Sequence, residues 1–143
     1  MKPEQAIEIL KERGLKFRDT RSIQWKANIS IWTLLILLIY HRDSVAILSE
    51  SCCLKALVLT SILLVHLGFC FLVQRSLEYD KAIGDIIVEN LDRNPEAIFK
   101  VSKGEIKSRQ AKGLLRPTTI TWFILQVGLT GILILIFCVS TNP

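Results

Sequence analysis

The stretch that decides the fold is CLKALVLTSILLVHLGFCFLV, residues 53–73. Lys55 is its only charged residue, and its length suits a helix that crosses the roughly 30 Å of bilayer hydrocarbon. Residues 119–140 form a second such run without charge, and residues 27–40 form a shorter one. Because a soluble fold of 143 residues cannot bury three helices that are apolar on every side, the sequence predicts a membrane protein.

The predicted fold class is an all-α integral membrane protein with three transmembrane helices and a helical cytoplasmic extension between spans two and three. The segments are a cytoplasmic amphipathic N-terminal segment (1–26), a first span (27–41), a short outer loop (42–52), a second span (53–74), a cytoplasmic helical loop (75–117), a third span (118–140) and an outer tail (141–143). The first span is short. We expect it either to thin the bilayer or to continue past Arg42 and Asp43 toward Leu48.

Local signals place the helix boundaries. The N-terminal amphipathic helix is expected to begin near Pro3 and to end at Gly14, since proline suits a first turn and glycine a C-cap. The apolar spacing after residue 74 predicts that the second span continues as one long helix up to Asn94 and Pro95. A second, shorter helix is expected over residues 95–113, and Gly113 and Pro117 mark the turn into the third span.

The distribution of basic residues predicts the orientation. Seven of the 18 lysines and arginines precede the first span, two lie between the first and second spans, nine lie between the second and third, and none follows. Short loops rich in lysine and arginine stay in the cytoplasm. The N-terminus and the long loop are therefore expected inside and the C-terminus outside, in the bacterial inner (plasma) membrane as a multi-pass protein. The positive charge suits an anionic leaflet and predicts no direct binding of nucleic acid.

Four polar residues lie within the predicted spans: His66, Gln126, Asn28 and Thr130. Counting from Arg75 and Arg116 at about 1.5 Å per residue places His66 and Gln126 both roughly 14 Å from the inner boundary. Two interpretations remain open. The pair can line a polar pathway or switch, as ionisable groups in membranes often do, or a neutral His66 can donate a hydrogen bond to Gln126 and hold two helices together.

An apolar strip follows the cytoplasmic extension at helical spacing, and we expect it to bind a partner. Its residues are Leu77, Ile83, Ile86, Ile87 and Leu91. The N-terminal helix of the same chain, matching helices of other copies or a soluble cytoplasmic protein can cover it. Because three spans with little soluble mass make an incomplete bundle, a homo-oligomer in the lipid bilayer is expected.

The remaining signals concern anchors and chemistry. Trp25, Trp32, Tyr40 and Trp122 are predicted as interfacial anchors. Cys53 and Cys138 share a depth at the outer face, where a disulfide is conceivable. No P-loop, GxSxG or HExxH motif occurs, and the cysteine spacing matches no zinc site, so we expect no catalysis, no metal and no cofactor.

The approach RSIQWKANISIW (residues 21–32), followed by a membrane hairpin with a short outer loop and a long helical extension, resembles small bacterial membrane effectors of the SLATT-like type. The resemblance is one of layout and covers about residues 15–95, and the third span lies outside it. It implies a channel or membrane-perturbing effector, in anti-phage defence, held inactive until a partner or a nucleotide signal arrives. The alternative function is a non-conducting membrane anchor or assembly subunit that binds a soluble partner.

Overall fold

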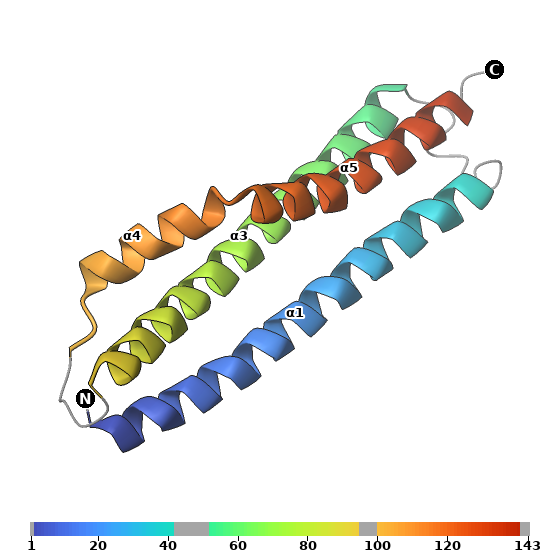
Figure 1. Ribbon diagram of the computed structural model, residues 1–143. Helices are drawn as coiled ribbons and strands as arrows, with labels where there is room; N and C mark the ends of the chain where they lie inside the picture. Colours follow the sequence, from blue (N-terminus) through green and yellow to red (C-terminus); the bar gives the residue numbers. More distant parts are fainter. Residues whose placement is uncertain (1, 42–51, 95–99, 141–143) are drawn as a thin grey trace. The chain divides into compact units, whose positions relative to one another are not determined.

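The structure is a computed structural model that describes residues 2–41, 52–94 and 100–140. All regular structure in these residues is helical (Figure 1). The helices are α1 (Pro3–Tyr40), α3 (Cys52–Arg93), α4 (Lys103–Leu114) and α5 (Pro117–Ser140). Helices α1, α3 and α5 of the described residues are each long and apolar enough to cross a membrane, which confirms that the predicted number of membrane-length helices is three. The outer loop and the tail lie outside the described residues.

The chain divides into two compact units, and α1 and α3 contribute residues to both. The first unit contains Met1–Ile23 and Leu72–Ile120, and the second contains Gln24–Phe71 and Thr121–Pro143. The first unit therefore holds most of the charged sequence and α4, while the second holds most of the apolar runs.

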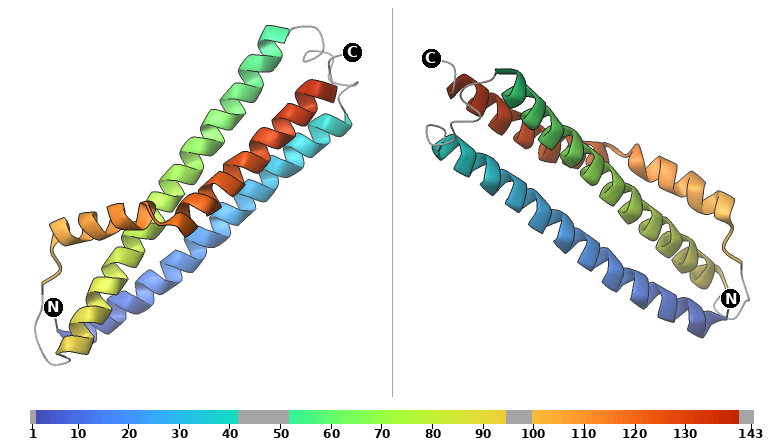
Figure 2. Two further views of the ribbon diagram at one scale, coloured as in Figure 1. Left: turned by 45° about the horizontal axis from the view of Figure 1, so that its top comes forward. Right: turned by 180° about the vertical axis from the view of Figure 1, so that it is seen from behind.

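The second unit packs three helices around a small apolar core. Leu35 of α1, Leu59 of α3 and Phe137 of α5 meet there and are almost fully buried. Figure 2 shows the helical segments of this unit running alongside one another. Many of the other large apolar side chains point outward, among them Leu64 and Val65, which are 62% and 71% exposed. A unit with this surface needs a lipid environment.

The first unit has its own core, which contains Ile83, Ile86 and Ile87 of the strip predicted to bind a partner. Ala6 of α1 and Ile106 of α4 pack against the strip residues of α3, while Leu91 packs at the edge of the cluster. Leu77, Ile83, Ile86 and Ile87 are at most 7% exposed. The prediction that these residues bind a partner is therefore wrong for this structure, because the chain's own helices cover the strip. The N-terminal helix was one of the covers expected from the sequence.

Most predicted helix ends agree with the structure, with two clear exceptions. The shorter helix expected over residues 95–113 corresponds to α4, which begins at Lys103, because residues 100–102 are not helical. Helix α3 ends at Arg93, and Pro117 begins α5. Gly14, in contrast, does not end a helix, because α1 continues to Tyr40 and no described residue has a positive φ. A glycine inside a helix costs only about 1 kcal/mol, which packing against α3 on its N-terminal side and the apolar run on its C-terminal side readily offset.

Candidate functional site

Five polar side chains converge in the interior of the second unit, and we call them the polar cluster. They are Gln24 and Asn28 of α1, His66 of α3, and Gln126 and Thr130 of α5. None is more than 2% exposed. Each helix places its members on one face, since Gln24 and Asn28, like Gln126 and Thr130, are four residues apart.

A continuous chain of hydrogen bonds links the three helices through His66. The Trp32 indole Nε1 donates to the Thr130 hydroxyl oxygen over 3.0 Å. That oxygen lies 2.8 Å from Nδ1 of His66, and Nε2 of His66 lies 2.9 Å from Oδ1 of Asn28. A neutral imidazole with its proton on Nε2 satisfies every step: Thr130 donates to Nδ1, and Nε2 donates to Asn28. The cluster needs no charged group to complete its bonding.

The predicted hydrogen bond between His66 and Gln126 is replaced by two other pairs. His66 bonds to Asn28 and Thr130, while Gln126 accepts a hydrogen bond from the side-chain amide of Gln24 over 3.0 Å. Counting residues from Arg75 and Arg116 correctly predicted that His66 and Gln126 lie at similar levels of their helices. It could not specify the bond, because the direction in which each side chain leaves its helix depends on the rotation of the packed helices.

Three participants were not predicted from the sequence as members of this site. Gln24 lies outside the apolar run that defined the first span. Cys70 completes the network through its thiol, which lies 3.8 Å from Oδ1 of Asn28. Trp32 was taken for an interfacial anchor, yet its N–H points inward. The spacing of Gln24, Asn28 and Trp32 at four-residue intervals was the signal, because it places all three on one helix face.

The hydrogen bond between Asn28 and His66 also bears on the extent of the first span. Asn28 is the second residue of the span predicted over residues 27–41, yet it bonds to His66, which counting from Arg75 predicts near mid-depth. At the level of this hydrogen bond, the apolar run of α1 has only just begun, whereas α3 and α5 are already well inside theirs. Lys26, which is exposed, lies at this level, where its aliphatic stem can let the ammonium reach the polar boundary.

Two buried polar atoms of the cluster have no hydrogen-bond partner among the described residues: Oε1 of Gln24 and Nδ2 of Asn28. One is an acceptor and the other a donor, and their residues are one turn apart on α1. Among residues 2–41, 52–94 and 100–140, no group of three or more histidine, cysteine, aspartate or glutamate side chains could hold a metal ion. The hydrogen bonds of the cluster join α1, α3 and α5.

The predicted aromatic anchors pack partly against one another, and the conceivable disulfide is absent. Trp25 packs edge-on against both Trp32 and Trp122, with ring centroids 6.4 and 6.0 Å apart. Trp25, Trp122 and Tyr40 are 38%, 42% and 81% exposed, and their place at the membrane interface stays a prediction. Cys53 has a free thiol, so the conceivable disulfide with Cys138 is not formed.

The first unit holds its helices together with ion pairs. The buried carboxylate of Asp80 on α3 pairs with Arg13 of α1, and Nζ of Lys16 lies 3.6 Å from its second oxygen. On the other side of α3, Glu89 accepts a hydrogen bond from Arg109 of α4 over 2.5 Å. The hydrogen bond from Arg109, with the positive charge of Arg109 next in importance, lowers the pKa of Glu89. The same hydrogen bond to Glu89 raises the pKa of Arg109.

A close approach between α3 and α4 occurs at Gly113. A Cβ at this position would lie only 2.1 Å from the carboxylate of Glu78, which is 7% exposed. Oε1 of Glu78 accepts hydrogen bonds from Thr119, over 3.2 Å, and from Gln74, over 3.3 Å. Glu78 thus connects α3 to the first turn of α5, where a negative charge is favoured by the helix dipole.

No protein-family model, curated protein or solved structure matches this chain.

Proposed function

We propose that this chain is a non-conducting membrane anchor or assembly subunit, embedded through the second unit and exposing the first unit in the cytoplasm. The burial of the polar cluster carries the proposal. A pore lined by several copies needs polar side chains on an outer face of each copy, and a pore through one copy needs a polar lumen. The polar cluster offers neither, because its members face one another and are at most 2% exposed.

The outward-facing hydroxyls support the same function. Ser30 and Ser61 are exposed, but their hydroxyls donate to backbone carbonyls of their own helices, at Lys26 and Leu57, over 2.8 Å. A hydroxyl bonded in this way is compatible with lipid and offers little to an ion. The outer surface of the second unit is therefore suited to lipid or to the apolar face of another subunit.

The partner-binding surface must differ from the strip predicted from the sequence, since α1 and α4 cover that strip. We propose that the exposed side of α3 in the first unit takes this role. Val88, which is 46% exposed, lies on it beside the exposed charges of Lys81 and Asp85. A soluble partner would contact this mixed surface without unfolding the core.

A reconstitution experiment tests the function. Purified protein in liposomes that contain a self-quenched dye should cause no more leakage than empty liposomes. Affinity purification from native membranes should recover a soluble protein in stoichiometric amount, which Val88→Glu should release and Val88→Thr should retain. Leakage by the wild-type protein without any added factor would contradict the non-conducting function.

A second candidate is a channel or membrane-perturbing effector in a bacterial defence system, acting as a homo-oligomer. The unpartnered atoms Gln24 Oε1 and Asn28 Nδ2 favour it, because they gain hydrogen bonds if the helices separate and water enters. In that case the arrangement described above is the closed state. Leakage that appears only after a trigger is added, and that His66→Leu changes, would select this candidate.

A further inference from the structure

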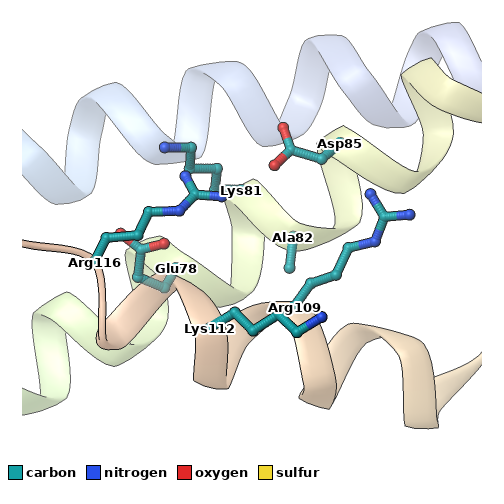
Figure 3. A pocket seen from close by; sticks show the side chains of 7 residues that line it. All are labelled: Glu78, Lys81, Ala82, Asp85, Arg109, Lys112 and Arg116. Atoms are coloured by element: carbon teal, nitrogen blue, oxygen red, sulfur yellow. The ribbon is translucent and has the colours of Figure 1, made fainter.

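A cavity of about 310 Å³ lies in the first unit between α3 and α4 (Figure 3). Six of the side chains that line it are charged: Lys81, Arg109, Lys112, Arg116, Glu78 and Asp85. None of its lining residues belongs to the polar cluster. Lys81 and Asp85 also border the partner surface proposed above, but binding of a small ligand in this cavity is a separate property. It brings four cations and two carboxylates to one concave surface.

Most of the positive charge in this cavity is uncompensated. Arg109 is occupied by Glu89 and Glu105, with N–O distances of 2.5 and 2.9 Å. Within the described part of the chain, by contrast, Lys81, Lys112 and Arg116 make no ion pair within 4.0 Å. All three are exposed, so their charged ends can reach a ligand.

The carboxylates do not neutralise these three cations. Glu78 is turned toward Gly113 and accepts hydrogen bonds from Thr119 and Gln74. Asp85 is exposed, and among residues 2–41, 52–94 and 100–140 it makes no ion pair within 4.0 Å. Three unpaired cations beside carboxylates that can accept from hydroxyl groups match a ligand that carries both a phosphate and hydroxyls.

We propose that this cavity binds the phosphate ester of a polyol, with Lys81, Lys112 and Arg116 holding the phosphate and Asp85 accepting from a hydroxyl of the polyol. The position of Arg116 favours a lipid headgroup as the source. Arg116 immediately precedes α5, and Glu78 bonds to Thr119 on the first turn of that helix. Basic pockets at the ends of transmembrane helices lie at the level of lipid phosphates.

Native mass spectrometry of the full-length protein in a neutral detergent tests this proposal. Dioctanoyl phosphatidylglycerol is the lipid probe, glycerol phosphate is the soluble probe, and dioctanoyl phosphatidylcholine is the zwitterionic control. The test variant combines Lys81→Gln, Lys112→Gln and Arg116→Gln. The matched control combines Lys11→Gln, Arg18→Gln and Lys103→Gln, which removes the same charge from exposed positions outside the cavity. Circular dichroism checks that both variants remain helical.

We expect phosphatidylglycerol to bind in preference to phosphatidylcholine. The test variant should weaken binding on the order of a hundredfold, and the single variant Lys112→Gln about fivefold, while the matched control changes it by less than about twofold. Binding of glycerol phosphate with the same dependence on the three cations would support the site with a soluble source. Equal losses in the two triple variants, or binding of neither probe by the wild-type protein, would overturn the proposal.

Discussion

Nδ1 of His66 lies 2.8 Å from the hydroxyl oxygen of Thr130, and this contact joins α3 to α5 in the middle of the second unit. The same hydroxyl oxygen accepts from Trp32 of α1. One threonine therefore connects all three helices, and its hydroxyl also lies 3.3 Å from the backbone oxygen of Gln126 as an alternative acceptor. The position of Thr130 makes it the most informative site for substitution in the polar cluster.

Thr130→Val should destabilise the second unit by about 1–2 kcal/mol. Valine keeps the shape of threonine but leaves the Trp32 N–H and Nδ1 of His66 without their partner. Thr130→Ser keeps the hydroxyl and should recover most of this loss. Unfolding followed by circular dichroism in detergent measures both variants. Equal stability of the valine and serine variants would show that the hydrogen bonds contribute nothing.

His66→Leu should lower stability by about 1–3 kcal/mol while leaving the permeability of protein-containing liposomes unchanged. The substitution removes the bonds to Asn28 and Thr130 and leaves both groups buried. Unfolding in detergent and dye leakage are measured on the same preparation. Unchanged stability together with altered leakage after a trigger would assign His66 to a pathway and contradict the role proposed for the polar cluster.

Arg13→Met should destabilise the first unit by about 1–3 kcal/mol, because it leaves the Asp80 carboxylate, 1% exposed, with only the more distant Lys16. Arg18→Met, at an exposed position on the same helix, is the control and should change stability by less than about 0.5 kcal/mol. In the double variant Arg13→Met with Asp80→Asn, the loss should be smaller than the sum of the two single losses. Additive losses would mean that the two side chains do not interact.

Gly113→Ala should destabilise the contact between α3 and α4 by about 1 kcal/mol, although alanine favours helix more than glycine does. Its Cβ would displace the Glu78 carboxylate, which lies 2.1 Å away, and break the bond to Thr119. In a Glu78→Ala background the same substitution should instead stabilise the protein, since the obstacle is gone. A destabilising effect in both backgrounds would place the clash elsewhere.

Glu89→Gln should reduce stability at neutral pH by a small amount that disappears in acid. The partner Arg109 depresses the pKa of Glu89 in the folded protein. The ionised carboxylate therefore adds stability above the ordinary pKa of glutamate, and this contribution is lost as the pH falls through that value and then through the lowered pKa. Thermal unfolding of both proteins over a pH series measures the gap. Asp92→Asn, at an exposed position of α3, should show no such gap.

The long second helix illustrates what could be predicted from the sequence. Its apolar run, the helical spacing that follows and the pair Asn94 and Pro95 give its extent, and α3 ends at Arg93. The strip on its C-terminal part was recognised as apolar, and the N-terminal helix, which covers it together with α4, was one of several covers left open. The periodicity of apolar residues identifies a helix face that must be buried. It does not say which other helix, from this chain or another, packs against that face.

The sequence by itself determined three membrane-length helices. The length of an apolar run and its lack of charge are enough to identify such a helix, whatever packs against it. It also identified His66, Gln126, Asn28 and Thr130 as the polar residues to explain. Only the tertiary structure decided that His66 bonds to Asn28 and Thr130, and that Gln126 bonds to Gln24. Hydrogen bonds need atoms within about 3 Å, and that distance depends on how the packed helices are rotated and shifted against one another. No count of residues along a single helix contains that information.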